Sequence, residues 1–356
     1  MRILHLGPLW FPVSRDAAGG RETWLAGLIN ALSKLGIRNT LLASGDSQTT
    51  AELVAVVPRH LVALMQERAA AEHAYYEQHQ LMLAVERATD FDVIHSHLSP
   101  GAFVLSALPS IGARVLHTQH TPVWSDCQWL VRQRPDLWLS TVSEFQARRL
   151  RESGARRCLV IHNGVDVNSF TFQPHGGDEL VFLGRIEKGK GPDLAVATAT
   201  KLGRPLTLAG PIVDGELFET AIKPHLGEQI RYVGIVNHGQ KNKLLGDAGC
   251  ALLPFRGAEG FGMVSIEAMA CGTPVAALAN GALPEVVEPG VTGFLTNDPD
   301  ELADLVIQAT KLDRARVRAR VAERFDLGVV AGNYVKLYEQ IVASSPASRT
   351  SSARRV

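Results

Sequence analysis

Residues 259–267 read Glu259-Gly260-Phe261-Gly262-Met263-Val264-Ser265-Ile266-Glu267, and the apolar stretch that follows ends at Gly272 and Pro274. Gly260 and Gly262 permit backbone conformations and close approaches that a side chain would block. Glycine and proline after an apolar stretch are typical helix stop signals, so this segment predicts a loop that enters a short helix. Free N–H groups and the helix dipole at such a start favour an anion such as a phosphate. Because Glu267 could accept hydrogen bonds from hydroxyl groups, the segment suits a nucleotide-sugar.

Glu259 and Glu267 could also be ordinary solvated residues. Features elsewhere in the chain are needed to distinguish this possibility from a ligand-binding role. The chain has 356 residues, which predicts two domains of ordinary size or one very large domain. Hydrophobic residues make up 46% and charged residues 20%, as is typical of a globular enzyme with buried sheets. Lys+Arg and Asp+Glu both number 36, and this zero net charge argues against a nonspecific nucleic-acid binder.

The cysteines and the apolar segments indicate the compartment. The four cysteines have neither paired nor zinc-like spacing, which predicts reduced thiols and a cytoplasmic location. No apolar run approaches the length of a membrane span, and the first residues are too strand-like for a signal peptide. Membrane association is not expected, since glutamates in residues 51–90 oppose a lipid-binding face. No tight spacing of histidines with a carboxylate appears in residues 51–90, so no metal site is expected.

Short apolar segments alternate with amphipathic ones, which predicts an α/β protein with parallel sheets covered by helices on both faces. The strands expected in the first half are Arg2–Leu6, Asn39–Ala43, Val93–His95, Arg114–Thr118, Leu137–Val142 and Leu159–His162, and the helices are Glu22–Leu35, Pro100–Leu108 and Glu144–Glu152. The strands expected in the second half are Glu179–Leu183, Leu206–Ala209, Ile230–Val233, Cys250–Pro254, Pro274–Leu278 and Gly293–Leu295, and the helices are Pro192–Lys201, Leu217–Lys223, Gly239–Leu245, Met263–Cys271 and Pro299–Lys311.

A polar, breaker-rich segment at residues 172–178 separates the halves and predicts a domain boundary. We therefore expect one doubly wound unit over residues 1–172 and a second over residues 173–326. Ligands of such sheets bind beyond the carboxyl ends of the strands, and two facing units would form a cleft. Residues 51–90 interrupt the alternation and are expected to form one or two helices. The Ser- and Arg-rich end, Ser344–Val356, is expected to be disordered.

Other candidate site residues lie where predicted strands end. Arg185 follows the first strand of the second half and Lys190 precedes the next helix, so the two cations would suit a diphosphate. Gly19 and Gly20 open the first helix, where a glycine pair lets backbone amides approach a phosphate. This turn is neither a GxGxxG fingerprint nor a Walker loop, which argues against a dinucleotide-dependent dehydrogenase. His120 follows another strand, at the edge of the same predicted cleft.

Together these motifs resemble those of the retaining glycosyltransferases of family 4, which have the GT-B fold. The resemblance covers nearly the whole chain and is carried by Glu259…Glu267, Gly184-Arg185…Lys190-Gly191, Asn163-Gly164-Val165-Asp166, Gly281-Ala282-Leu283-Pro284-Glu285-Val286-Val287, Gly19-Gly20 and His120. It implies two Rossmann-like domains that face each other across a cleft. It also implies a C-terminal helix, Leu327–Ile341, that crosses back so that residues 327–356 complete the first domain. Ala282 stands where family members often have a second glycine.

The resemblance implies a role for each matching residue. Arg185 and Lys190 would bind the donor diphosphate, which Gly20 would approach from the opposite domain. Glu267 would hold the ribose hydroxyls, and Glu259 and His120 would contact the transferred sugar. The implied donor-binding set is Gly19, Gly20, Arg185, Lys190, Glu259, Phe261, Gly262, Met263, Val264 and Glu267, and the implied catalytic set is His120, Glu259, Arg185 and Lys190.

By the same resemblance, the chain would move a sugar from a nucleotide-diphosphate sugar to a hydroxyl acceptor, with retention of configuration and without a metal or other cofactor. UDP is expected because it is the commonest donor nucleotide of the family. No residue indicates the acceptor, the sugar or the oligomeric state. Two alternatives stay open, a nucleotide-sugar epimerase that hydrolyses its donor and a catalytically silent sugar-nucleotide binding protein. The paired glutamates favour transfer.

Overall fold

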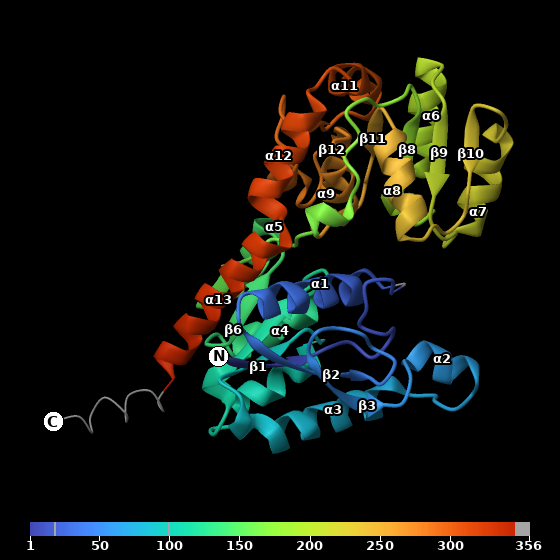
Figure 1. The fold of residues 1–356 in the computed structure, drawn as a ribbon. Coiled ribbons are helices and arrows are strands. Elements are labelled where there is room, and N and C mark those ends of the chain that lie inside the picture. Colours follow the sequence, from blue (N-terminus) through green and yellow to red (C-terminus); the bar gives the residue numbers. More distant parts are fainter. Residues whose placement is uncertain (18, 99, 346–356) are drawn as a thin grey trace. The chain divides into compact units, whose positions relative to one another are not determined.

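In the computed structural model, which describes residues 1–17, 19–98 and 100–345, the chain divides into two compact units (Figure 1). The first unit consists of Met1–Asn163 and Leu327–Val356, and the second of Gly164–Asp326. The first boundary therefore precedes the segment at 172–178. Its position follows from hydrogen bonds, because Thr171 N donates to Asn242 Oδ1 (3.0 Å) and Phe170 O accepts from Arg318 (2.8 Å), both in the second unit. Most of the end that we expected to be disordered lies outside the described residues.

The sheet of the first unit has seven parallel strands in the order β3-β2-β1-β4-β5-β6-β7. They are β1 (Arg2–Leu6), β2 (Arg38–Ser44), β3 (Glu52–Val57), β4 (Val93–Ser96), β5 (Val115–Gln119), β6 (Trp138–Thr141) and β7 (Arg157–Val160). The chain runs outward from β1 in both directions, so the strand order reverses between β1 and β4. This is the doubly wound topology that the alternating pattern predicts.

The expectation of helices throughout residues 51–90 is wrong at its start, because Glu52–Val57 forms β3 and pairs in parallel with β2. Three of its six residues are valine, whose branched Cβ favours an extended, pleated backbone. The Ala- and Glu-rich composition of the whole segment concealed this local signal. The remainder forms α2 (Leu61–Gln66) and α3 (His73–Arg87), as expected for a helical segment.

Helices cover both faces of this sheet. Helix α1 (Gly20–Lys34) packs against α13 (Leu327–Ser344) on one face, and α3 lies on the other (Figure 1). The C-terminal helix belongs to the first unit, and its Tyr334 and Tyr338 are fully buried. The first unit also contains α5 (Glu144–Glu152), the 3-10 helix η2 (Pro100–Ala107) and α4 (Ser125–Gln133), which the sequence analysis did not predict.

The sheet of the second unit has six parallel strands in the order β10-β9-β8-β11-β12-β13. They are β8 (Leu180–Leu183), β9 (Leu206–Ala209), β10 (Ile230–Tyr232), β11 (Cys250–Leu253), β12 (Val275–Leu278) and β13 (Gly293–Thr296). All six predicted strands are present. The first three residues of β8 and all of β11 are buried, because helices cover both faces of the sheet (Figure 1).

The helices of the second unit are α6 (Pro192–Leu202), α7 (Gly215–Leu217), α8 (His238–Asp247), α9 (Met263–Ala270), α10 (Leu283–Val286), α11 (Leu302–Ala309) and α12 (Arg314–Phe325). Helices α6 and α11 contact each other and the sheet, whereas α9 contacts α8, α12 and the sheet. Neither α10 nor α12 was predicted from the sequence. Among the described residues, no helix has both the length and the apolar character needed to cross a membrane.

Candidate active site

Three loops of the second unit meet beyond the carboxyl ends of β8, β11 and β12. They are residues 184–191, 254–262 and 279–282. Three hydrogen bonds tie them together, from Gly257 N to Gly189 O (2.9 Å), from Asn280 Nδ2 to Phe255 O (2.8 Å) and from Ala282 N to Glu259 O (2.9 Å). The loops therefore form one connected surface at the end of the sheet where doubly wound proteins bind ligands.

Two glycines allow the loops to approach this closely. Gly191 has a φ of +69°, and a Cβ there would collide with the carbonyl oxygen of Pro254. Gly281 has a φ of +61°, and a Cβ there would collide with the backbone of Glu259. The left-handed backbone and the lack of space both require glycine. Gly281 thereby determines where the backbone of Glu259 lies.

Lys190 and Glu259 form an ion pair across the first two loops. Their side chains are only 20% and 18% exposed, and Lys190 Nζ also lies 4.4 Å from the centroid of the Phe255 ring. Shielding from water strengthens both the ion pair and the cation–π contact. The arrangement holds a cation and a carboxylate side by side at the surface formed by the loops.

The start of α9 adjoins this pair. Gly262 precedes the helix with a left-handed φ of +87°, and a Cβ there would lie 2.8 Å from Leu283 Cδ2. The N–H groups of Met263 and Val264 follow, and the first N–H groups of a helix have no partner within it. Phe261 contributes backbone only, because its side chain is 3% exposed and its ring packs edge-on against Phe325, 5.8 Å between centroids.

Glu267 lies one turn further along α9 and forms an ion pair with Lys241 of α8. The two side chains are 12% and 20% exposed, and Lys241 Nζ lies 5.9 Å from the centroid of the Phe170 ring. Lys241 was not predicted from the sequence as a site residue. No local pattern marks it, because only the packing of α8 against α9 brings it to Glu267.

Arg185 lies differently from our expectation. We expected it at a buried strand end, but β8 ends at Leu183 and the Arg185 side chain is 58% exposed. Its guanidinium pairs with Glu187 at 2.8 Å. Arg185 lies two residues beyond the end of β8, and the burial of the strand does not extend to it. A role for Arg185 in donor binding stays a prediction.

In the first unit, Gly19 and Gly20 begin α1 as predicted. A Cβ at Gly19 would collide with the carboxylate of Glu22, whereas a Cβ at Gly20 would meet no described atom within 4 Å. Glu22 is 3% exposed, and burial raises the pKa of its carboxyl. Open space at Gly20 is what close approach of a ligand to the backbone requires.

His120 follows β5 and is partly exposed. Its ring meets the Trp24 ring edge-on at 4.9 Å, and its Nε2 lies 3.2 Å from Nδ1 of His97. Burial and the charge of Arg21 lower the pKa of His120 to about 3, so the ring is neutral at physiological pH. A neutral imidazole offers one N–H donor and one acceptor nitrogen.

Three more histidines lie behind His120. His5, His95 and His97 are buried, with one nitrogen of each within 4.8 Å of the others, a spacing at which a metal ion could be held. Burial lowers the pKa of His5 to about 4 and those of the other two well below 6.5. The sequence analysis singled out none of them, because they come together only when β1 pairs with β4.

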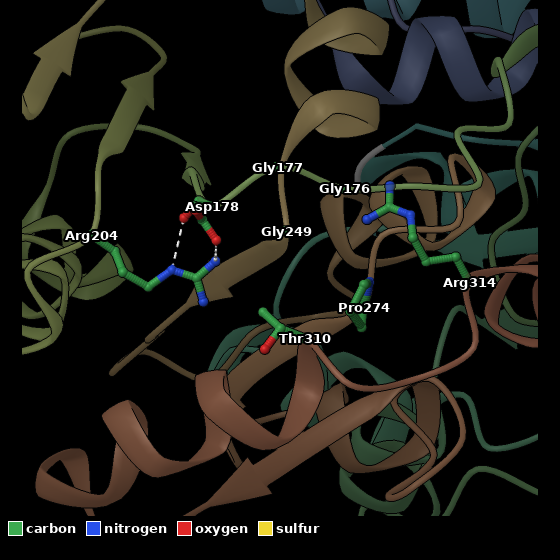
Figure 2. Close-up of a pocket in the computed structure, with 8 residues that line it drawn as sticks. All are labelled: Gly176, Gly177, Asp178, Arg204, Gly249, Pro274, Thr310 and Arg314. Atoms are coloured by element: carbon green, nitrogen blue, oxygen red, sulfur yellow. Dashed lines mark hydrogen bonds and ion pairs between the residues drawn. The ribbon is translucent and has the colours of Figure 1, made fainter.

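A cavity of about 260 Å³ lies at the other end of the second sheet, where Gly177, Gly249 and Pro274 precede β8, β11 and β12 (Figure 2). The protein itself uses the cations around it. Arg204 donates to the Asp178 carbonyl (2.7 Å), and Arg314 donates to the oxygens of Gln173, Ala248, Gly246 and Thr273. This cavity is separate from the three loops.

The predicted residues are therefore divided between the units. The second unit holds Arg185, Lys190, Glu259, Phe261 and Gly262 in its loops and Met263, Val264 and Glu267 in α9, whereas Gly19, Gly20 and His120 belong to the first unit. The arrangement in the second unit combines cations, free N–H groups and carboxylates.

Two protein-family models match the two halves of the chain. The family model for Glycosyltransferase Family 4 matches residues 18–169, and that for Glycosyl transferases group 1 matches residues 169–324. A phosphatidyl-myo-inositol mannosyltransferase of Mycolicibacterium smegmatis is 31% identical over 278 residues, which cover 71% of this chain and 72% of that protein. A D-inositol 3-phosphate glycosyltransferase of Actinosynnema mirum is 28% identical over 348 residues, covering 82% of this chain and 83% of that protein.

Solved structures agree on the fold. The structure of HepE from Anabaena in complex with UDP and glucose is similar with a TM-score of 0.72 and 20% identity, covering 96% of this chain and 100% of that one. The fold is that of the GT-B glycosyltransferases. The chain belongs to glycosyltransferase family 4, and it is a transferase.

Proposed function

We propose that this enzyme moves a sugar from a nucleotide-diphosphate sugar, with UDP as the nucleotide, to a hydroxyl acceptor. The observation that carries the proposal is the convergence of Lys190, Glu259 and the start of α9 at one end of a single sheet. A cation and free helix N–H groups suit a diphosphate, and a carboxylate suits sugar hydroxyls. The UDP and glucose bound to HepE support the choice of nucleotide.

The roles follow from chemistry and from the family resemblance. Lys190 and Arg185 would bind the diphosphate together with the first N–H groups of α9, and Glu267 would accept hydrogen bonds from the ribose. Lys190 is already paired with Glu259, so the diphosphate would replace that carboxylate as its partner. Glu259 would then be available to the transferred sugar, which His120 would also contact.

We further propose retention of configuration without a metal. The acceptor oxygen would bond to the anomeric carbon as the carbon–phosphate oxygen bond breaks on the same face, and the acceptor proton would pass to the departing phosphate. The charge that develops on the diphosphate would be balanced by the two cations and the helix start. The cytoplasmic location expected from the cysteines also stays a proposal.

Calorimetry with UDP, GDP and ADP, each in EDTA and in Mg²⁺, tests the donor site. UDP binding in EDTA, followed by transfer from a UDP-sugar with retained configuration by NMR, would support the proposal. A preference for GDP or ADP would mean that the donor carries that nucleotide in place of UDP. A requirement for Mg²⁺ would contradict metal independence. Donor hydrolysis or epimerisation without an acceptor would favour the epimerase alternative, and binding without turnover would favour the silent one.

A further inference from the structure

A chain of hydrogen bonds runs from β2 through the buried histidines of the first unit to His120. His5 Nε2 lies 3.1 Å from Asn39 Oδ1, and His5 Nδ1 lies 3.3 Å from His97 Nε2. His97 Nδ1 in turn lies 3.2 Å from His120 Nε2. Each neutral imidazole has one N–H and one lone pair, so the direction of one hydrogen bond decides the direction of the next.

The amide of Asn39 fixes that direction. Its Nδ2 donates to the carbonyl oxygen of Ile37 (3.1 Å), which can only accept. Nδ2 also donates to Ser33 Oγ (3.0 Å), whose own proton goes to the carbonyl oxygen of Ile29 (3.0 Å). Both contacts identify the amide nitrogen and leave the oxygen facing His5. Since Oδ1 has no proton to donate, His5 must carry its proton on Nε2.

The remaining protons follow ring by ring. The Nδ1 lone pair of His5 accepts the Nε2–H of His97. The Nδ1 lone pair of His97 then accepts the Nε2–H of His120. His120, the partly exposed end of the chain, is left with an unprotonated Nδ1.

We infer that Asn39 is a positioning residue that holds His120 in its Nε2–H tautomer, so that Nδ1 of His120 presents an acceptor to a substrate hydroxyl. The contact with substrate rests on the proposed function, whereas the tautomer does not. The Trp24 ring packs edge-on against the His120 ring, whose Nε2 faces Nδ1 of His97. This contact helps to hold the His120 ring in the orientation that the hydrogen bond to His97 needs.

A metal site is the alternative explanation for the close spacing of His5, His95 and His97. Hydrogen bonds already account for their nitrogens. His95 Nδ1 lies 2.8 Å from Tyr338 Oη and its Nε2 lies 2.6 Å from Thr118 Oγ1, and His5 is bonded to His97. A metal ion bound through one nitrogen of each ring would have to break at least two of these contacts, so the hydrogen-bond chain is the simpler explanation.

The test is the tautomer of His120 in the full-length wild-type protein, read from long-range proton–nitrogen NMR correlations with nitrogen-15-labelled histidine. The His120→Gln variant assigns the resonance. The Nε2–H pattern is expected. In Asn39→Leu the buried Nε2–H of His5 loses its acceptor. Reversal of the chain gives the N–H groups of His5 and His97 an acceptor nitrogen each, so His120 should change to Nδ1–H. Asn39→Asp, the matched control, keeps an acceptor oxygen and should keep Nε2–H.

In Asn39→Leu, kcat for sugar transfer should fall several-fold while the Kd for UDP stays unchanged, because the side chains that we propose to bind UDP lie in the second unit. An Nδ1–H tautomer in the wild type, or no change in Asn39→Leu, would overturn the inference. Stoichiometric Zn²⁺ binding that shifts His5, His95 and His97 would also overturn it. If Asn39→Leu does not fold, the wild-type spectrum decides. If His120 has the Nε2–H tautomer but the protein transfers no sugar, the proposed function is wrong and the role of Asn39 still holds.

Discussion

Lys190 and Glu259, 69 positions apart in the chain, form an ion pair that joins the loop after β8 to the loop after β11. Both side chains are largely shielded from solvent, so each group neutralises the other in the free enzyme. A diphosphate that binds Lys190 has to compete with Glu259. The pair therefore couples donor binding to the position of the carboxylate that we assign to the transferred sugar.

Replacing Lys190 with methionine should weaken UDP binding by about tenfold or more, since a charge-assisted hydrogen bond contributes about 1.5–3 kcal/mol. Titration calorimetry measures the change. Lys188→Met is the matched control, because Lys188 lies on the same loop and is exposed. Equal losses in both variants would contradict a specific role for Lys190.

Replacing Glu259 with glutamine should have the opposite effect on UDP. The variant removes the carboxylate that competes for Lys190, so UDP should bind more tightly while sugar transfer falls. Parallel calorimetry and initial-rate measurements separate the two effects. Weaker UDP binding together with unchanged transfer would show that Glu259 faces neither the diphosphate nor the sugar.

Gly281→Ala should reduce transfer by displacing Glu259. The new Cβ would collide with the Glu259 backbone, whereas a Cβ at Gly290, which also has a positive φ (+75°), would meet nothing within 4 Å. Both variants carry the strain of a left-handed backbone, about 1–2 kcal/mol. Gly290→Ala should therefore lower the thermal midpoint but keep kcat, and only Gly281→Ala should lose activity. Similar activity in the two variants would argue against the backbone contact.

Lys241→Met should destabilise the second unit, because it leaves the carboxylate of Glu267 without its partner in a site where that side chain is 12% exposed. An unpaired buried group costs about 1–3 kcal/mol. Lys243→Met is the control, since Lys243 is 78% exposed and pairs with Asp247 only at the surface. Circular dichroism during thermal unfolding compares them, and equal midpoints would contradict the prediction.

The elements of the fold could be predicted from sequence where the signal is local. The run Leu180–Leu183 is apolar throughout and forms β8, and Gly262 marks the start of α9. The prediction failed where composition masked a short strand, as at Glu52–Val57. It also missed the Arg-rich α12, although its buried Val317, Val321 and Phe325 recur every four residues. The contacts between side chains that are distant in the sequence could not be predicted.

In the candidate site, too, local features could be predicted from the sequence, whereas contacts that depend on packing could not. The sequence predicts that Lys190 and Glu259 follow strands of one parallel sheet, whose carboxyl ends lie at one edge. That the two strands are neighbours comes from the structure. The sequence does not reveal that Lys190 and Glu259 form an ion pair, nor that Lys241 joins Glu267, since these contacts depend on helix packing. Likewise, the exposure of Arg185 depends on where β8 ends.

The buried histidines predict acid sensitivity of the first unit. Burial lowers the pKa of His117 to about 3 and that of His5 to about 4, whereas both would titrate near 6.5 in the unfolded chain. Below pH 6.5 the unfolded state therefore binds more protons than the folded state. Stability is full above pH 6.5 and should fall as the pH is lowered towards 4, by up to about 1.4 kcal/mol per pH unit for each histidine.

All five tryptophans lie in the first unit, so tryptophan fluorescence during urea unfolding reports on that unit alone. The His117→Gln variant removes one titrating group and should reduce the slope of unfolding free energy against pH by up to about 1.4 kcal/mol per unit below pH 6.5. The control His79→Gln removes a histidine that is exposed, and its slope should match that of the wild type. A slope unchanged by His117→Gln would mean that His117 takes up its proton without unfolding, and the acid sensitivity would then have to come from the other histidines.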